Sequence, residues 1–412
     1  RDFLVPSRIH SGKFYALPQS PQTYKQLLMV SGFDKYFQIV KCFRDEDFRS
    51  DRQPEFTQID IEMSFVDQDD ITDMGTHFIR TLWKEILDVD LPNKFTILTY
   101  EEAMNTYGSD KPDLRFDMPL MNLNEYVINS DFDTFKNIIN SDGLVKAVKV
   151  NSADGYSRKI IDELTAWLKD QYGVKGLAFF KCSDGDKLEG GISKFFNKNI
   201  QQTMINDLDI KSGDIVFIVG DKPKITLSAL GALRLKLAHR ENLVDENKWS
   251  PLWVVDFPLF DWNEDHKRWD SLHHPFTSPN FEDIEKLDDN PGAVRSLGYD
   301  IVMNGYEVGG GSIRIHNKDL QSKIFNLLNI NDKEADEKFG FLMNAFKYGA
   351  PPHGGMAFGF DRLIMLLIGS KQIRDVIAFP KTTSAMSLMD NSPSNVDDKQ
   401  LDELGLFLKE RK

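Results

Sequence analysis

Hydrophobic and polar residues alternate cleanly along residues 55–65, which is the period of a β-strand with two different faces. One face carries Thr57, Ile59, Ile61, Met63 and Phe65, and the other carries Gln58, Asp60, Glu62 and Ser64. The run 38–44 is also strand-like, so the pattern predicts a hairpin connected by residues 45–54. Hairpin loops usually have about 2–5 residues, so this long connection indicates a functional loop. The polar face either meets solvent or lines a site.

A second hairpin is predicted from residues 298–304 and 306–314, because Asn304-Gly305 favours a type I′ turn. Asp300 and Glu307 then stand on adjacent strands, close enough to share a divalent cation.

The second strand of this hairpin contains three successive glycines, 309–311. Such a run is either an ordinary glycine-rich turn or a place where a ligand or another backbone comes close. Simple alternation puts Glu307 and Arg314 on opposite faces. Both can face one site only if the glycines form a bulge, which we predict.

Residues 354–359 lead into an apolar stretch that predicts a helix. Arg362 falls in the first turn, where the helix dipole does not favour a cation. It therefore indicates a bound anion beside free backbone N–H groups, unless Asp361 merely offsets its charge.

Arg44 ends the first strand of the first hairpin, and its position allows two interpretations. It can clamp a phosphate or carboxylate, or it can pair with a neighbouring acid.

Three blocks organise the chain: 1–112, 113–245 and 246–412. The middle block alternates strand-like and helix-like patterns, with strands predicted over 145–150, 176–182 and 214–220 and a helix over 156–169. It holds 18 basic and 19 acidic residues, whereas most of the formal net charge of −14 lies in its flanks. This contrast favours an inserted domain. Near the C-terminus, residues 382–398 are expected to be irregular and 400–409 to form a short helix.

The composition limits the possible classes of protein. The chain has 412 residues, of which 41% are hydrophobic, which excludes a wholly disordered protein. The longest apolar run near the C-terminus, 363–368, is far below the roughly 20 residues of a membrane span. The two cysteines, Cys42 and Cys182, are expected to be buried free thiols in a reducing compartment, the cytoplasm.

The acidic balance, with a pI near 5.1, argues against indiscriminate nucleic-acid binding but leaves room for local basic patches. Candidates for such a patch are Arg234, Lys236 and Arg240. Two adjacent histidines, His273 and His274, point in different directions on an extended chain, so a shared metal is not expected. One of them can stand over a substrate pocket. His353 is predicted to lie in a loop and has no clear role.

Several segments, taken together and in order, resemble the class II aminoacyl-tRNA synthetases. Residues 43–47 through 58–62 resemble motif 2, and residues 355–362 resemble motif 3. Residues 1–8, 19–22, 273–277 and 309–314 resemble the bacterial-type aspartyl group of that class, and 113–245 resembles its insertion domain. The resemblance covers essentially the whole chain.

The resemblance implies an α+β fold, an antiparallel sheet flanked by helices with an inserted α/β domain. It also implies two chemical steps. L-aspartate and ATP with Mg²⁺ give aspartyl-adenylate, and the aspartyl group then passes to the terminal adenosine of tRNA. The tRNA is an aspartate tRNA and possibly also an asparagine tRNA.

Site residues follow from the resemblance by position. Arg44 and Arg362 are the implied catalytic residues. The aspartate-binding set is Gln22, Lys25, Arg44, Asp60, His273 and Arg314. Lys25 and Arg314 hold the side-chain carboxylate with help from Gln22 and His273, and Asp60 accepts from the α-ammonium. The ATP-binding set is Arg44, Asp45, Glu46, Gln53, Glu307, Gly359, Phe360, Asp361 and Arg362. Asp300 and Glu307 are the implied Mg²⁺ ligands.

The family pattern also includes an N-terminal anticodon-binding barrel and motif 1, which builds a homodimer. Both precede the segment that resembles residues 1–4, and the first residue is Arg1 rather than Met. The chain is therefore expected to be a piece of a longer, dimeric protein. Two alternatives stay open: an amide-forming paralogue that acts on aspartate without tRNA, and a non-catalytic nucleotide-binding relative.

Overall fold

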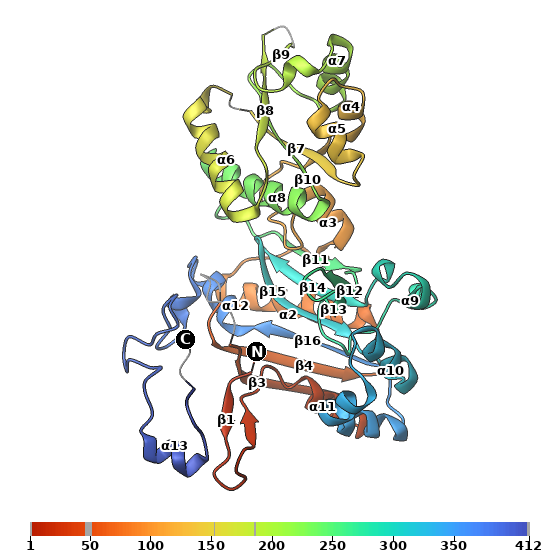
Figure 1. Cartoon of the computed structure of the whole chain (residues 1–412), viewed down its shortest axis with the longest axis vertical. Helices are drawn as coiled ribbons and strands as arrows, with labels where there is room; N and C mark the ends of the chain where they lie inside the picture. The colour runs from red at the N-terminus through yellow and green to blue at the C-terminus, as the bar shows by residue number, and fades with distance from the viewer. Residues whose placement is uncertain (1, 46–51, 152, 185–186, 410–412) are drawn as a thin grey trace. The chain divides into compact units, whose positions relative to one another are not determined.

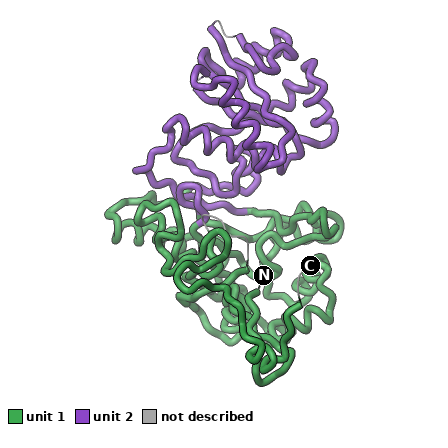
Figure 2. The backbone as a smooth tube through the Cα atoms, turned by 60° about the vertical axis from the view of Figure 1, so that its left-hand side comes forward, with its two compact units in different colours: residues 1–95, 256–301, 308–412 green, residues 96–255, 302–307 purple. Residues whose placement is uncertain are grey.

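The structure is a computed structural model that describes residues 2–45, 52–151, 153–184 and 187–409. It divides into two compact units (Figure 2). Unit 1 contains residues 1–95, 256–301 and 308–412, and unit 2 contains residues 96–255 and 302–307. The predicted middle block, 113–245, lies inside the range of unit 2.

In unit 1 the strands β3, β4, β16, β15 and β14 lie next to one another in that order (Figure 1). The pairs β3–β4, β4–β16 and β16–β15 are antiparallel. The bounds are β3 Lys35–Phe43, β4 Glu55–Ser64, β14 Gly298–Met303, β15 Tyr306–Ile313 and β16 His353–Gly359. Two smaller antiparallel pairs are β1 Leu4–Pro6 with β2 Phe14–Ala16, and β12 Phe260–Asn263 with β13 Arg268–Ser271. The predicted antiparallel α+β architecture and both predicted hairpins are confirmed.

The helices of unit 1 are α1 Gln22–Val30, α2 Gln68–Leu87, α9 Lys286–Asp289, α10 Lys318–Leu327, α11 Asp332–Ala345, α12 Phe360–Leu367 and α13 Asp398–Leu404, with short 3₁₀ turns at Phe281–Asp283, Pro291–Ala293, Phe346–Tyr348 and Ile373–Val376. Helix α13 begins and ends earlier than predicted. The Asp397 side chain caps it by accepting from the Gln400 N–H at 2.8 Å, and Gly405 ends it in the left-handed conformation with φ of 65°.

Strand register gives the sheet of unit 1 one apolar and one polar face. Residues opposite each other in an antiparallel pair point to the same side. Ile59 is opposite Phe358, and Phe358 packs against Phe78 of α2 with ring centroids 4.6 Å apart. On the other side Glu62 is opposite Gly355, which is opposite Ser312. Helix α1 covers this polar face, because Lys25 reaches the Asp60 carboxylate there. Asp60 and Glu62 on the polar face are therefore buried, whereas Gln58 and Ser64 are half-buried.

The glycines of β15 allow close contact between backbones, and the predicted bulge is wrong. The pairing of β15 with β16 runs without interruption from Gly309 to Ile313. A Cβ on Gly311 would lie 2.0 Å from the Gly355 carbonyl oxygen, and one on Gly355 would lie 2.1 Å from Glu62 Oε2. Side chains are excluded at these positions because the neighbouring strand and a buried carboxylate fill the space. The turn itself follows the prediction, with Asn304 and Gly305 at φ of 53° and 85°.

Unit 2 contains a sheet with the strand order β6-β7-β10-β8-β9 and a parallel pair of β5 and β11. Its elements are β5 Thr96–Thr99, α3 Tyr100–Tyr107, β6 Met121–Asn122, α4 Asn124–Ile128, α5 Asp133–Ile139, β7 Leu144–Val150, α6 Arg158–Tyr172, β8 Ala178–Ser183, β9 Lys187–Glu189, α7 Lys198–Asp207, β10 Ile215–Asp221, α8 Pro223–Arg240 and β11 Pro251–Val255, with 3₁₀ turns at Ala153–Gly155 and Ser193–Phe195. The three strands and the helix predicted in this region are confirmed. Every residue of β10 is buried, because hydrophobic clusters pack on both faces of the sheet.

Arg234 of unit 2 is buried and does not form a basic patch. Its side chain is 2% exposed and donates to the carbonyl oxygens of Met118 at 2.9 Å and of Asp113 and Phe116 at 3.1 Å. The guanidinium also lies 4.0 Å from the ring centroid of Phe116. A nucleic acid cannot reach a guanidinium held in this way. The expectation that Arg234 belongs to a local basic patch is therefore wrong.

Substitution of Arg234 by methionine is expected to destabilise unit 2 by about 3 kcal/mol, because three buried carbonyl groups lose their donor. Lys236→Met is the matched control, since Lys236 is an exposed cation on the same helix that lies over Trp167. We expect the control to change stability by less than about 0.5 kcal/mol. Urea denaturation of both variants measures the difference, and equal midpoints would contradict the structural role.

Both cysteines are buried free thiols, as predicted. Within the described ranges, no helix is long and apolar enough to cross a membrane.

Candidate active site

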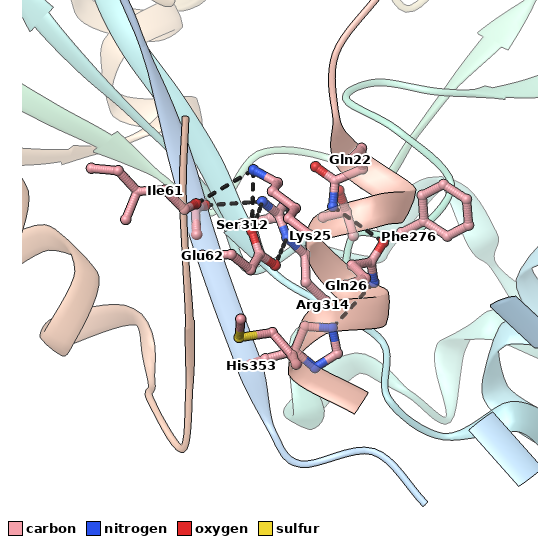
Figure 3. A network of polar contacts seen from close by, with 12 residues as sticks. Gln22, Lys25, Gln26, Ile61, Glu62, Phe276, Ser312, Arg314 and His353 are labelled. Atoms are coloured by element: carbon pink, nitrogen blue, oxygen red, sulfur yellow. Dashed lines mark hydrogen bonds and ion pairs between the residues drawn. The ribbon is translucent and has the colours of Figure 1, made fainter. Parts of the chain in front are cut away.

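Four buried charged side chains meet on the polar face of the unit 1 sheet, and Figure 3 labels three of them, Lys25, Glu62 and Arg314. Lys25 of α1 forms an ion pair with Asp60 and a second one with Glu62 Oε2 at 3.1 Å. Arg314, which directly follows β15, binds both oxygens of Glu62, with Nε–Oε1 at 2.9 Å and Nη2–Oε2 at 3.0 Å. All four side chains are at most 2% exposed. Two cations and two carboxylates are thus held together without contact with bulk water.

Each N–H group of the Arg314 guanidinium has a partner. Two bind Glu62, and a third donates to the Gly355 carbonyl oxygen at 3.1 Å. The remaining two, on Nη1, lie 2.7 Å from Ser312 Oγ and 2.8 Å from His274 Nε2. A guanidinium has five N–H donors, so all of them are engaged. A substrate carboxylate can bind Arg314 only by replacing one of these partners.

The two carboxyl groups have opposite pKa shifts. Burial alone raises the pKa of Glu62, but the charges of Arg314 and Lys25 outweigh it and lower that pKa to about 2. Burial raises the pKa of Asp60 and outweighs the opposing effect of Lys25. Glu62 is therefore a fixed anion that orients the cations. The ionisation of Asp60 depends more strongly than that of Glu62 on the group that binds it.

His274 rather than His273 contacts Arg314. Arginine can only donate, so Nε2 of His274 accepts from it, while Nδ1 accepts from the Phe276 backbone N–H at 3.2 Å and lies 3.3 Å from Thr277 Oγ1. Burial, together with the charge of Arg314, lowers the pKa of His274 well below its ordinary value, which agrees with a neutral ring. His273 lies edge-on against Phe257, with centroids 4.7 Å apart.

Two further residues were predicted for the amino-acid pocket, Gln22 and Arg44, and each has a contact of its own. Gln22 is the first residue of α1, is half-buried and donates to Gln26 Oε1 at 3.2 Å. Arg44 follows β3, and its guanidinium lies over the ring of Phe56 at 5.0 Å. It is half-buried, at the end of the first predicted hairpin.

The loop between β3 and β4 is described only in part. Glu46 lies outside the described residues, and Asp45 is exposed. Gln53 is buried, and its side-chain amide makes two hydrogen bonds with the backbone of Lys381, at 2.8 and 3.1 Å. The observed contacts of Gln53 thus join this loop to the C-terminal segment.

The residues of the predicted motif 3 lie at the junction of β16 and α12. Gly359 ends β16, and Phe360, Asp361 and Arg362 form the first turn of α12. Asp361 Oδ2 accepts from the Thr57 backbone N–H at 2.7 Å. This bond ties α12 to β4, which is a structural role for Asp361 other than the offset of the Arg362 charge that the sequence left open. Arg362 is half-buried beside it.

The predicted metal ligands Asp300 and Glu307 are half-buried, on β14 and β15 respectively. Carboxylates at such positions suit a hard cation such as Mg²⁺, which is often held by one or two carboxylates and substrate phosphates. Over the described part of the chain, no group of three or more His, Cys, Asp or Glu side chains could hold a metal ion by itself.

Sequence reasoning missed Glu62, His274 and Ser312 as members of this site. The alternation of β4 did place Glu62 beside Asp60, but the sequence does not show that its carboxylate binds two cations. The choice between His273 and His274 depends on the direction of one loop. Ser312 shares a face with Arg314 by simple alternation, and this spacing was the signal that could have found it.

Comparison with known proteins identifies the family of the chain. A family model described as tRNA synthetases class II (D, K and N) matches residues 1–383. Proteins named aspartate–tRNA ligase from Staphylococcus saprophyticus and Staphylococcus aureus are 56% and 53% identical over 410 residues. These alignments cover 99% of this chain and 69% of each relative.

Among solved structures, an Entamoeba histolytica asparaginyl-tRNA synthetase in complex with asparaginyl-adenylate is 16% identical, with a TM-score of 0.47. The match covers 93% of this chain and 59% of that one. The assignment does not depend on this distant likeness. The chain belongs to the class II tRNA synthetase family, in the group that acts on aspartate, lysine or asparagine.

Proposed function

We propose that this chain is the catalytic core of an aspartate–tRNA ligase. It activates L-aspartate with ATP to aspartyl-adenylate and then transfers the aspartyl group to the terminal adenosine of tRNA. The observation that carries the proposal is the buried pair of cations, Lys25 and Arg314, joined through Glu62. The names of relatives at 53–56% identity support it independently.

The charges of the pocket match those of the amino acid. Aspartate has two carboxylates and one ammonium group. The proposed set offers the cations Lys25, Arg44 and Arg314 and the Asp60 carboxylate, while Glu62 orients Lys25 and Arg314. Lys25 and Arg314 bind the side-chain carboxylate, and Asp60 accepts from the α-ammonium. A neutral amide in place of that carboxylate leaves buried cations poorly paired, which disfavours asparagine.

The activation step needs no protein nucleophile, because the α-carboxylate of aspartate attacks the α-phosphorus and pyrophosphate leaves. Arg44 binds the α-carboxylate and the α-phosphate and stabilises the negative charge that develops between them. Arg362 lies against the nucleotide, as do Gly359, Phe360 and Asp361. Asp45, Glu46 and Gln53 bind ATP from the loop between β3 and β4.

Mg²⁺ supplies charge neutralisation at the phosphates when it is bound. Asp300 and Glu307 are the proposed ligands, and Glu307 also belongs to the proposed ATP-binding set. Aspartate tRNA is the proposed partner, and the complete protein is proposed to act as a homodimer in the cytoplasm.

Aspartate-dependent ATP–pyrophosphate exchange on the full-length protein tests the proposal. Exchange with aspartate, and little with asparagine or lysine at the same concentration, is the expected result. Charging assays with aspartate tRNA and asparagine tRNA then define the tRNA partner. Exchange with lysine or asparagine and none with aspartate would refute the proposed substrate.

A further inference from the structure

A chain of polar contacts runs from the backbone of Pro351 through His353 and Gln26 to the side chain of Gln22, and Figure 3 shows its links from His353 onwards. His353 Nδ1 lies 2.8 Å from the Pro351 carbonyl oxygen, and its Nε2 lies 3.2 Å from Gln26 Nε2. Gln26 Oε1 in turn accepts from Gln22 Nε2 at 3.2 Å. His353 and Gln26 are both 0% exposed. His353 also begins β16, so it is not the loop residue that the sequence suggested.

The chemistry of the first link fixes the direction of all the others. A carbonyl oxygen can only accept, so His353 must carry a hydrogen on Nδ1. In the neutral ring Nε2 then has no hydrogen and must accept, which requires the NH₂ group of Gln26 to face it. The Oε1 atom of Gln26 consequently faces Gln22 and accepts from its NH₂ group. The carbonyl oxygen of Gln22 is left pointing away from Gln26 (Figure 3).

The surroundings of His353 favour the neutral ring. Burial lowers the pKa of His353, and the charge of Arg314 and the nearby His316 act in the same direction. Glu62 on β4 and the hydrogen bond to the Pro351 carbonyl oxygen raise this pKa, but they do not outweigh burial, and Glu62 is already bound to two cations. The residue that α1 brings to the ring, Gln26, carries no charge.

We propose that His353 is a positioning residue for the amino-acid pocket, because it fixes the amide of Gln26 and thereby directs the carbonyl oxygen of Gln22 towards the α-ammonium of the bound amino acid. This inference rests on the proposed function and keeps Gln22 in the aspartate-binding set. It assigns the Gln22 carbonyl oxygen to the α-ammonium, whereas the family resemblance implied that Gln22 helps to hold the side-chain carboxylate. The ammonium is the hydrogen-bond donor of aspartate at neutral pH, and an acceptor is therefore the useful group to present.

Loss of the acceptor at position 353 removes this control. Gln26 can then rotate by half a turn and present its NH₂ group to Gln22, whose own amide must rotate in response. Gln22 would then present hydrogens to an ammonium group that also only donates. The interaction lost is one hydrogen bond to a charged group, which corresponds to about a tenfold change in affinity.

Two amide substitutions separate this role from simple packing. His353→Asn keeps a donor near the position of Nδ1 but has no acceptor near Nε2, whereas His353→Gln can place its oxygen near Nε2. In pyrophosphate exchange, His353→Asn is expected to raise the KM for aspartate by about tenfold. Its KM for ATP and its kcat should stay within about twofold of the wild type. His353→Gln should restore most of the aspartate KM.

Equal KM values for aspartate in the two variants would overturn the proposal, and so would a parallel rise in the KM for ATP.

A second measurement does not need enzymatic activity. The ¹⁵N–¹H correlation spectrum of histidine-labelled protein, with His353 assigned from the variants, should show a neutral ring with its hydrogen on Nδ1 at pH 7. A hydrogen on Nε2 alone, or a charged ring, would overturn the inference. A wild-type protein that fails to activate aspartate refutes the proposed function instead, and the spectrum still decides the state of His353.

Discussion

An Arg314→Met variant will lose both aspartate activation and a large part of its stability. The substitution removes a guanidinium whose five N–H groups are all bound and leaves the Glu62 carboxylate buried with Lys25 alone. Removal of one partner from a buried ion pair costs about 3–5 kcal/mol. Loss of the charged contact to the substrate carboxylate is expected to lower kcat/KM for aspartate by about 10³-fold.

The double variant Glu62→Gln/Arg314→Met separates these two effects. Because the uncompensated carboxylate is now a neutral amide, most of the lost stability should return. Aspartate activation should stay as low as in Arg314→Met, since the cation is still absent. Urea denaturation and pyrophosphate exchange measure the two quantities on the same samples. Recovery of exchange in the double variant would show that Arg314 acts through stability and not through the substrate.

Arg44→Ala will abolish most of the exchange activity while the fold remains intact. In the proposed mechanism Arg44 stabilises the charge that develops at the α-phosphate, and removal of one such group costs about 10³-fold in rate. Its observed contact is with the ring of Phe56, which contributes about 0.5–1 kcal/mol to stability. The thermal midpoint should therefore move little.

Lys41→Ala is the matched control for Arg44. Lys41 is an exposed cation on the same strand, and it pairs with Glu55 at 3.1 Å. Exposed pairs contribute little, so both activity and stability should stay close to those of the wild type. Near-normal exchange in Arg44→Ala, or an equal loss in both variants, would refute the assigned role of Arg44.

The strands and the main helices could be predicted because their signals are local. The alternation in 55–65 defines two faces, and Asn304-Gly305 defines a turn, without any knowledge of the rest of the chain. Which face is buried is a different question. Asp60 and Glu62 look like residues that meet solvent, and only the position of α1, which brings Lys25 to them, shows otherwise.

The details of the site depended on contacts between distant segments. The sequence grouped Lys25, Asp60 and Arg314 only through a family resemblance, because they are far apart in the chain. The role of Glu62 depends on the bidentate contact with Arg314, 252 positions away. The same limitation produced the error at Arg234, which resembles a surface cation in sequence but is surrounded by three backbone carbonyl groups.

The fully bonded guanidinium of Arg314 makes substrate binding a competition rather than a simple addition. An incoming ligand must displace His274 or Ser312 from Nη1, and so it gains only the difference between the new contact and the old one. A carboxylate outcompetes a neutral imidazole or hydroxyl, because its bond to a cation is charge-assisted. The amide oxygen of asparagine is itself a neutral acceptor and gains almost nothing by the exchange. His274 and Ser312 thus contribute to selectivity, because only a ligand that binds Arg314 more strongly than they do can replace them. A carboxylate meets this condition and an amide does not.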